Sequence, residues 1–381
     1  MKTDHDVAIL GGGLVGAMAA LQLQRRGIDC VVLESRPWGK EQKAVVGEAL
    51  TEGTSVFLRH ELELTDWLKE NAYRKFGFDF LIRPRNAPLP ETMEDCHELL
   101  LSLTPLEKNP NAFTKLIPTY HVERTAFNRH VAERAIAAGA RYLDGAGVEQ
   151  VALGSPHRVH YAHKGAPQSL TARWVIDASG RRTVLGRQLG ITRPVAELDT
   201  AAVWNRFENV NDDPAFWRTF HGVDRRRHTI HFCGDGFWIW WIHLKGGHTS
   251  VGVSYDKAQH QPDIKSDDRG FWELIRKFPP VAKALADARP LEPYQYYAHL
   301  PYNSDYWLSQ QRYALIGDAA WFTDALYSIG IETACRQLTA LAPIVVGDTR
   351  GDAICPKNVA QLNEEFLNTQ KAVLQLNKFK Y

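Results

Sequence analysis

Three glycines near the start of the chain have the spacing of a site that binds dinucleotides. Gly11, Gly13 and Gly16 form a GxGxxG pattern, and Glu34 lies 23 residues after Gly11. In such a loop the first glycine permits a tight turn, the second lets the backbone approach a pyrophosphate, and the third lets a helix pack closely on a strand. The helix N-terminus stabilises the phosphate charge, and the acid accepts hydrogen bonds from a ribose. An acid at this position favours a ribose with free hydroxyls, as in FAD or NAD.

The elements that position these residues can be predicted from the local pattern. Val7 to Leu10 is a short apolar run typical of a buried strand, and Leu14 to Arg26 has apolar residues at helical spacing. Gly27 stands where a helix C-cap is expected, and Cys30 to Leu33 is a second apolar run directly before Glu34. The order strand, glycine turn, helix, strand and acid predicts one βαβ unit.

Two segments far along the chain extend this site. Residues 173–180 read RWVIDASG, a strand that ends at Asp177, and a strand over 312–316 is followed by Gly317 and Asp318. Together with the glycine loop, these segments resemble FAD proteins of the p-hydroxybenzoate hydroxylase fold. The resemblance implies that Asp177, Gly317 and Asp318 bind FAD, and that a helix over 330–346 points its N-terminus at the isoalloxazine. The segment HVERTAFNRH resembles the family helix whose arginine, here Arg124, approaches FAD.

Within that superfamily the chain is most similar in its motifs to flavin-dependent halogenases and their relatives. Residues 46–50 (VGEAL) resemble the GES-L segment, which implies a cofactor contact by Glu48. Residues 324–330 (DALYSIG) resemble the DPxxSSG stretch beside the flavin, which implies contacts by Ser328 and Gly330. Lys75 lies where halogenases carry the lysine that handles hypohalous acid.

The segment WIWWIH over residues 238–243 resembles the halogenase WxWxIP signature, with His243 in place of the proline. Strand alternation puts Trp238 and Trp240 on one face and Trp241 on the other. We expect Trp238 and Trp240 to line a substrate pocket, although tryptophans on a strand also serve as core packing. His243 is a candidate acid or base because its ordinary pKa lies near neutrality, and a hydrogen-bonded core histidine is the alternative. Lys75 has the same ambiguity, since it stands in a charged stretch typical of a solvated surface.

The resemblance implies a C4a-hydroperoxyflavin that reacts with an aromatic substrate. We expect hydroxylation of an indole or phenol-type ring in a biosynthetic pathway, because His243, Ala325 and Ile329 depart from the halogenase pattern. Halogenation through Lys75 is the alternative. Relatives also include flavoproteins that modify a tryptophan of a partner protein during quinone-cofactor maturation. A further hypothesis, from a different class of function, is a flavoprotein that turns over slowly and acts mainly in binding or maturation. The electrons come from NAD(P)H directly or through a separate flavin reductase, and DASG favours the second arrangement.

The expected fold class is α/β, with a Rossmann-like FAD-binding domain of the GR2 type and an inserted β-sheet substrate domain. We expect the FAD-binding domain over 1–83, 119–190 and 305–381, and the substrate domain, with an antiparallel sheet, over 84–118 and 191–304. Segments rich in β-branched and aromatic residues suggest the second sheet, and the stretch from Pro84 to Pro118 reads as an irregular excursion. The strand-like segments are 158–162, 228–233, 237–244 and 249–255.

Composition excludes several other classes of protein. Lys plus Arg number 45 and Asp plus Glu number 44, so the net charge of +1 argues against a nucleic-acid partner. The five cysteines form no CxxC pair, so we expect no metal site and a reducing, cytoplasmic environment. We find no apolar run long enough to predict a membrane span. The amphipathic segment Asn363 to Lys380 could dock a partner or pack on its own domain.

Overall fold

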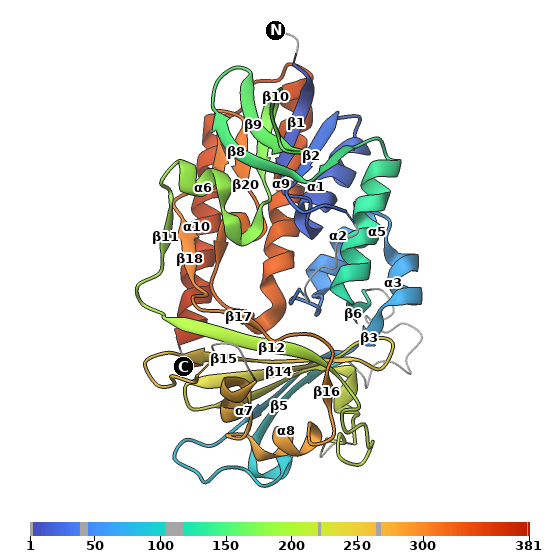
Figure 1. Ribbon diagram of the computed structural model, residues 1–381, viewed down its shortest axis with the longest axis vertical. Coiled ribbons are helices and arrows are strands. Elements are labelled where there is room, and N and C mark those ends of the chain that lie inside the picture. The colour runs from blue at the N-terminus through green and yellow to red at the C-terminus, as the bar shows by residue number, and fades with distance from the viewer. Residues whose placement is uncertain (1–2, 39–44, 104–116, 220–221, 264–267, 379) are drawn as a thin grey trace.

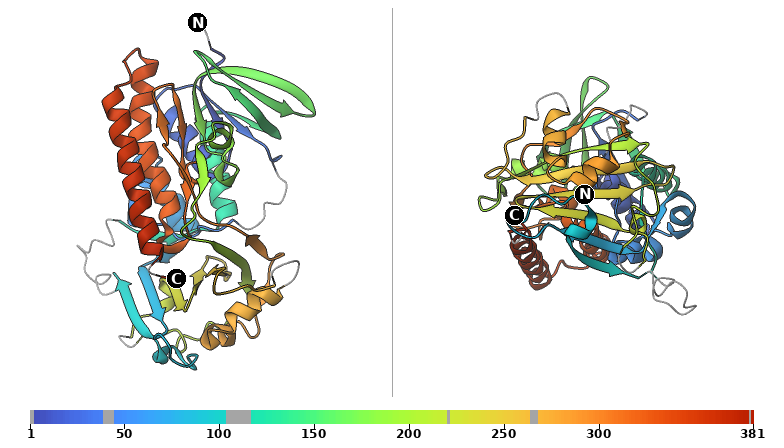
Figure 2. Two further views of the ribbon diagram at one scale, coloured as in Figure 1. Left: turned by 90° about the vertical axis from the view of Figure 1, so that its left-hand side faces the viewer. Right: turned by 90° about the horizontal axis from the view of Figure 1, so that it is seen from below.

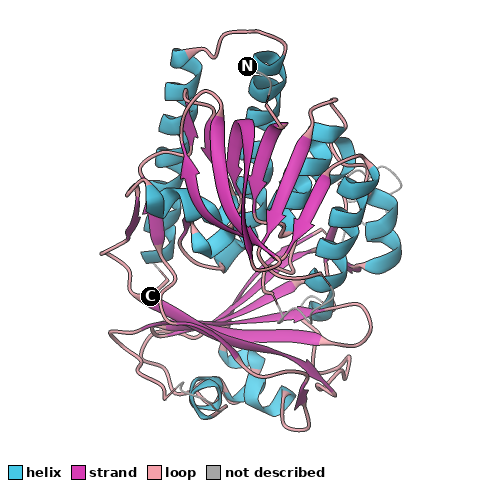
Figure 3. Ribbon diagram, turned by 45° about the horizontal axis from the view of Figure 1, so that its top comes forward, coloured by secondary structure: helices cyan, strands magenta, loops and turns pink. Residues whose placement is uncertain are grey.

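The computed structural model describes residues 3–38, 45–103, 117–219, 222–263, 268–378 and 380–381. It contains two large sheets, one above the other in the view of Figure 3, with helices around the upper sheet and two short helices below the lower one. The α/β fold class and the presence of two sheets are as predicted.

The first sheet has eight strands and a parallel centre in which β1 pairs with β10 and β2, β2 with β7, and β10 with β20. The strands β8 and β9 form an antiparallel hairpin, and β9 pairs antiparallel with β10. The strands are β1 (His5–Leu10), β2 (Cys30–Glu34), β7 (Arg141–Asp144), β8 (Ala146–Ala152), β9 (His157–His163), β10 (Ala166–Asp177), β19 (Leu308–Ser309) and β20 (Tyr313–Leu315).

The second sheet also has eight strands and is antiparallel apart from the pairing of β13 with β4. It runs below the first sheet in Figure 1. Its strands are β4 (Gly77–Ile82), β5 (His97–Ser102), β12 (Thr200–Glu208), β13 (Thr229–Gly234), β14 (Phe237–His243), β15 (Thr249–Asp256), β16 (Arg289–Pro290) and β17 (Gln295–Tyr297). Two small sheets join β11 (Thr192–Pro194), β18 (Tyr302–Ser304) and β21 (Trp321–Phe322), and β3 (Tyr73–Lys75) and β6 (Thr119–His121).

The longest helices pack on the first sheet. In Figure 2, α9 and α10 run side by side along one face of this part of the molecule. The α-helices are α1 (Leu14–Gln24), α2 (Glu52–His60), α3 (Thr65–Asn71), α5 (Arg124–Ala137), α6 (Val184–Gln188), α7 (Arg269–Ile275), α8 (Pro279–Ala284), α9 (Ile329–Thr349) and α10 (Pro356–Lys378).

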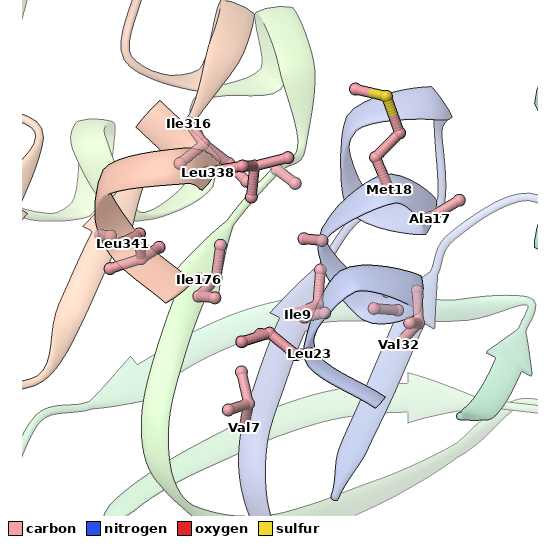
Figure 4. Close-up of a cluster of buried hydrophobic side chains, with 14 of the residues drawn as sticks. Val7, Ile9, Ala17, Met18, Leu23, Val32, Ile176, Ile316, Leu338 and Leu341 are labelled. Atoms are coloured by element: carbon pink, nitrogen blue, oxygen red, sulfur yellow. The ribbon is translucent and has the colours of Figure 1, made fainter. Parts of the chain in front are cut away.

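The core of the first part lies between the sheet and these helices. Val7 and Ile9 of β1, Ile176 of β10, Met18 of α1 and Leu338 of α9 belong to one buried cluster, drawn in Figure 4. The stretch Leu326–Thr349 is the one described segment that is long and apolar enough to cross a membrane by length and composition alone. Half of its most apolar window is buried inside the protein, and α9 packs against α1 and α2, as a core helix does.

Three expectations about the fold need correction. The strand expected over 158–162 is β9, which pairs with β10 of the first sheet instead of joining the second. The strand β4, expected in the FAD-binding domain, pairs with β13 and β5 of the second sheet. The stretch from Pro84 to Pro118 contains β5, so it is not wholly irregular; its residues 104–116 lie outside the described part. We propose the same discontinuous division into two domains, with β4 moved to the substrate domain.

Helix α10 packs on its own domain. Val359 and Phe366 belong to the core of the first part, and Asn363 Oδ1 accepts hydrogen bonds from the backbone N–H groups of Trp307 and Leu308, both at 3.1 Å. Of the two roles expected for this segment, the contacts therefore favour packing within the chain.

Candidate active site

One cavity of about 600 Å³ connects the glycine loop of the first sheet with the upper face of the second sheet. It receives residues from segments that are more than 300 positions apart in the sequence, from Gly11 to Gly330. Ten of the predicted site residues line it: Gly11, Gly13, Glu34, Glu48, Arg124, Trp238, Trp240, Asp318, Ser328 and Gly330.

A different steric reason requires glycine at each of the three loop positions. Gly11 has φ +102°, and a Cβ there would lie 2.6 Å from the carbonyl oxygen of Ala178. A Cβ at Gly16 would lie 2.0 Å from the carbonyl oxygen of Gly11, so Gly16 lets α1 pack against the loop without lining the cavity. A Cβ at Gly13 would meet no atom within 4 Å and would enter open space at the cavity wall. The loop therefore leaves room at Gly13 for a group bound in the cavity.

The acid that ends β2 is tied to this loop. Glu34 Oε2 accepts a hydrogen bond from the N–H of Gly12 at 2.7 Å, and Oε1 accepts one from the N–H of Arg36 at 2.9 Å. These bonds fix the carboxylate at the edge of the cavity beside the N-terminus of α1, where the helix dipole favours negative charge.

A second acid lies deeper in the cavity and lacks a full set of partners. Glu48 is buried, its Oε2 has no hydrogen-bond partner, and burial raises the pKa of its carboxyl. Arg124, at the start of α5, donates to the carbonyls of Val46 at 2.6 Å and Gly47 at 3.3 Å, so it holds the segment that carries Glu48. A buried oxygen without a partner indicates a site shaped for a bound polar group.

Two residues predicted to bind the cofactor support the cavity from outside. Asp177 accepts hydrogen bonds from the N–H groups of Ser179 at 3.0 Å and Leu185 at 2.7 Å, which occupy both carboxylate oxygens. It shapes the turn whose residues 178–180 line the cavity, and we correct its role to positioning. Gly317 (φ +58°) donates its N–H to Gln337 Oε1 at 2.8 Å. This bond fixes the backbone next to Asp318, whose pKa is raised by burial although Arg181 and Arg124 oppose the shift.

Helix α9 begins at the cavity with an unusual turn. Tyr327 and Ser328 both have left-handed backbone conformations, with φ of 64° and 55°. The turn directs the N-terminus of the 21-residue helix at the cavity, where Ser328 and Gly330 line the wall. The partial positive charge of this N-terminus stabilises an anionic group bound beside it.

The far wall is aromatic, because alternate side chains of β14 point into the cavity. Trp238, Trp240 and Ile242 line it, as the alternation predicted for the two tryptophans. Trp204 of β12 and Tyr297 of β17 continue this wall, with their ring centres 4.9 Å apart. The wall is suited to a flat, apolar ring.

His243 lies on the opposite face of β14, and its prediction as a catalytic residue at the flavin is wrong. Its Nε2 accepts a hydrogen bond from Trp241 Nε1 at 3.0 Å, and its Nδ1 lies 3.3 Å from Thr249 Oγ1. Burial lowers the pKa of His243 to about 4, so the ring is neutral near pH 7. It is a hydrogen-bonded core histidine.

Lys75 is buried directly behind the aromatic end of the cavity. Its Nζ donates to the carbonyl of Leu50 at 3.1 Å and lies 3.7 Å from the centre of the Phe78 ring. Ala49, which precedes Leu50 in the chain, lines the cavity, whereas Lys75 lies behind the lining residues. Burial lowers the pKa of Lys75 to about 7, so much of it is a neutral amine near that pH. The surface position suggested by its charged sequence neighbours is therefore wrong.

The sequence analysis missed residues that the fold brings to this site from a distance. Arg181, which follows DASG, places its guanidinium 4.5 Å from the centre of the Tyr297 ring. Asp324 lines the cavity and is held by two residues beyond α10: Lys380 Nζ lies 3.2 Å from its Oδ1, and the Tyr381 hydroxyl donates to its Oδ2. His231 of β13 also lines the cavity. Arg181 directly follows DASG and Asp324 begins the DALYSIG stretch, so motifs were available for both, whereas none pointed to His231.

The residues present fit FAD. The open position at Gly13, the fixed acid Glu34 and the unpartnered oxygen of Glu48 lie along one elongated cavity that ends at the N-terminus of α9. A dinucleotide requires such a series of sites: room for the pyrophosphate, an acid for the ribose and a positive dipole near the flavin.

Curated relatives are similar over nearly the whole chain. A 1H-pyrrole-2-carbonyl-[peptidyl-carrier protein] chlorinase of Pseudomonas fluorescens is 28% identical over 91% of this chain and 75% of its own length. The flavin-dependent halogenase chlA of Dictyostelium discoideum is 26% identical over 90% of this chain. The chain spans 60% of that second relative's length.

Solved structures share the fold. The crystal structure of halogenase PltM in complex with phloroglucinol and FAD has a TM-score of 0.82 at 22% identity, covering 98% of this chain and 75% of that one. The myxobacterial chondrochloren halogenase CndH also gives 0.82, at 21% identity, with 99% and 82% covered. Residues 4–354 match the family described as FAD binding domain. The chain therefore belongs to this family of FAD-dependent oxidoreductases and is halogenase-like within it.

Proposed function

We propose that this protein halogenates an electron-rich aromatic substrate with FAD as its cofactor. The sequence motifs favoured hydroxylation, because His243, Ala325 and Ile329 depart from the halogenase pattern. We now place halogenation first. The relatives that are similar over 90% or more of the chain support this order, because they are named as halogenases. The observation that carries the proposal is Lys75, a buried lysine with a lowered pKa at the aromatic end of the cavity.

The cavity divides into a cofactor part and a substrate part. The loop at Gly13, Glu34, Glu48 and Arg124 would hold FAD, and the N-terminus of α9 would stabilise negative charge on its ring system. FAD, when bound and reduced, supplies the activation of dioxygen that oxidises a halide to hypohalous acid. The aromatic wall, which includes Trp238 and Trp240, holds the substrate ring and excludes water.

Lys75 then carries or activates the electrophile. Its neutral amine attacks the halogen of hypohalous acid, the bond between halogen and oxygen breaks, and the hydroxide that leaves takes a proton from the nitrogen. The reaction needs the unprotonated amine, which a pKa of about 7 supplies near neutral pH. Leu50 and Phe78 hold the nitrogen behind the aromatic end of the cavity.

We propose that a separate flavin reductase delivers reduced flavin, as the DASG segment favours. A free phenol and a pyrrole carried on a peptidyl carrier protein both agree with the flat aromatic wall, and the chlorinase of Pseudomonas fluorescens is named for the second kind of substrate.

The test is mass spectrometry of the products formed with a phenol or pyrrole in the presence of bromide and labelled dioxygen. The FAD-loaded protein is supplied with NADH and a flavin reductase. Bromine in the product supports the proposal. Labelled oxygen in the ring without bromine would restore the hydroxylase prediction, and consumption of dioxygen with neither product would contradict both.

A further inference from the structure

Among the buried histidines, one differs from the rest in its hydrogen bonds. Four have both ring nitrogens within hydrogen-bond distance of a protein atom. These four are His121, His157, His228 and His243. His231 is 1% exposed, its Nδ1 has no partner, and we find no hydrogen bond to its Nε2 among the described residues.

The ring of His231 lies in the aromatic wall of the cavity. It stacks on Phe80 with 4.4 Å between ring centres and 12° between ring planes, and it lies 5.5 Å from the Trp238 ring. Its strand neighbours β4 and β14 place Phe80 and Trp240 directly opposite it. Thr229 and His231 line the cavity, while the intervening Ile230 belongs to the core on the other side of the sheet. Strand alternation therefore directs His231 inward.

An imidazole among aromatic rings cannot replace the hydrogen bonds that it makes in water. A buried polar group without a partner is destabilising, and such groups are rare outside functional sites. Burial, together with the charges of Lys75 and Lys380, lowers the pKa of His231 to about 3. The backbone of Asp79 and Thr229 is near enough to oppose that shift, although Nδ1 has no partner within hydrogen-bond distance. The neutral ring has one acceptor nitrogen and one N–H.

His231 and Lys75 both lie near the Phe78 ring. The Lys75 ammonium is 3.7 Å from the centre of Phe78, and the Phe78 and His231 rings are 5.9 Å apart. A substrate ring seated against Trp238 and Trp240 is thus near both groups. One can hydrogen-bond a substituent while the other directs the electrophile at a ring carbon.

We infer that His231 is the substrate-binding hydrogen-bond acceptor of this site, and that the substrate ring carries an O–H or N–H that donates to a nitrogen of its neutral ring. The inference rests on the proposed function. The hydrogen bond to His231 shifts electron density from the O–H or N–H group into the ring, and a ring carbon attacks the halogen of hypohalous acid or of the Lys75 haloamine. The C–halogen bond forms, and the bond from halogen to oxygen or nitrogen breaks. The ring carbon then loses its own proton, which restores aromaticity. The hydroxide that leaves, or the Lys75 nitrogen, takes this proton, and the net change is arene plus hypohalous acid to haloarene plus water.

Binding measured without halide tests the hydrogen bond independently of halogenation. The ligands are phloroglucinol and its trimethyl ether, titrated calorimetrically into protein loaded with oxidised FAD. In the unaltered protein we expect the phenol to bind more tightly than the ether, and His231→Leu to reduce the ratio of their affinities about tenfold. His231→Gln, which keeps an acceptor, should retain part of the preference. FAD content checks that each variant folds, and His160→Gln, on β9 away from the cavity, should leave the ratio unchanged. An unchanged ratio in both FAD-loaded His231 variants would overturn the inference.

Kinetics separate a hydrogen-bond acceptor from a packing residue. For a phenol, His231→Leu should lower kcat/KM about tenfold, and the loss should shrink as the pH approaches the pKa of the phenol itself, because the phenolate has no proton to donate. The charged groups near the ring are Lys75 and Lys380, whose titration acts on phenol and ether alike, so the profile for the trimethyl ether is recorded as the reference. The trimethyl ether, which has no acidic proton, should react equally well with both proteins. An equal loss for phenol and ether contradicts the role as a hydrogen-bond acceptor. If the unaltered protein incorporates no halogen, the proposed function fails, and the binding ratio still decides on His231.

Discussion

The ammonium nitrogen of Lys75 lies 3.7 Å from the centre of the Phe78 ring. This cation–π contact and one hydrogen bond to the Leu50 carbonyl are the main compensation for burying the charge. They are weaker than the hydration that the ammonium loses, and the pKa is lowered accordingly. The residue is thus costly for stability and suited to reactivity, a combination that is typical of functional sites.

Replacing Lys75 should separate oxidation from halogen transfer. In Lys75→Met we expect halogen incorporation to fall on the order of 100-fold or more, because no amine remains to carry the electrophile. Consumption of dioxygen by the reduced, FAD-loaded protein should change by less than about twofold, since Lys75 lies outside the cofactor part of the cavity. Product mass spectrometry and an oxygen electrode measure the two rates. Lys69→Met, at an exposed lysine of α3, is the matched control. Undiminished halogenation in Lys75→Met would contradict the role.

The same variant should be more stable, by an amount that depends on pH. The folded-state pKa of Lys75 is about 7 and its unfolded value is about 10.4, so the unfolded chain binds the proton more tightly between these values. The stability of the unaltered protein therefore rises with pH in this window, and the penalty is greatest below pH 7. We expect the free energy of unfolding of Lys75→Met to exceed that of the parent by a few kcal/mol near pH 6, with the difference shrinking toward pH 10. Urea titrations at several pH values test this, and a difference independent of pH would count against it.

Gly13→Val should abolish FAD retention without unfolding the protein. A Cβ there meets no protein atom within 4 Å, so we expect the substitution to cost little in the fold, and the side chain enters the cavity where we place the pyrophosphate. The absorbance of purified protein near the flavin bands is the measurement. Gly147 on β8 also has open space around a Cβ, and its neighbours Ala146 and Val148 line the cavity, so it points to the other face. Gly147→Val should keep its flavin, and a yellow Gly13→Val would refute the placement of the loop.

The local elements of the cofactor site could be predicted because short-range rules determine them. The turn at Gly11 and the packing at Gly16 follow from sterics within one βαβ unit, and α1 begins at Leu14 as expected. Alternation along β14 also placed Trp238 and Trp240 on the cavity side. Applied two residues further, the same rule puts His243 beside Trp241 on the opposite face; the resemblance to the WxWxIP signature led to the wrong side.

Long-range contacts were beyond these rules. β4 joins the second sheet by pairing with β13, about 150 residues later, and no local pattern in Gly77–Ile82 encodes that partner. Lys75 is surrounded by charges in sequence, yet the short strand β3 turns it inward. Asp324 is in contact with Lys380, which lies 56 residues later in the chain. Such residues become part of the site only through tertiary packing.

Replacing His243 should affect acid stability rather than cofactor or substrate binding. Its folded pKa is about 4, below the ordinary value of 6.5, so the folded state loses stability as the pH falls from 6.5 toward 4. His243→Gln removes this titration, and we expect its unfolding free energy to vary less over that range, by up to about 3 kcal/mol. At pH 7 the variant should be less stable than the parent, because the bond to Trp241 is altered. FAD affinity should be unchanged; a loss of FAD at pH 7 by folded protein would place His243 at the cofactor after all.

Asp348, near the end of α9, should stabilise the fold at neutral pH and lose that effect in acid. Its buried carboxylate accepts hydrogen bonds from Arg173 at 2.6 Å, Arg312 at 2.9 Å and Trp174 at 3.0 Å, so it ties α9 to β10 and to the turn before β20. Although burial opposes the shift, these bonds hold its pKa well below the usual range. A lowered aspartate pKa adds stability above the unfolded value of about 3.9 that is lost as the pH falls below it.

We expect Asp348→Asn to lower the unfolding free energy by about 2–3 kcal/mol at pH 7, with the difference narrowing below pH 4. Asp305→Asn, at an exposed pair with Arg193, should change it by less than about 1 kcal/mol. Equal effects of the two substitutions at pH 7 would show that the Asp348 network does not hold α9 to the sheet.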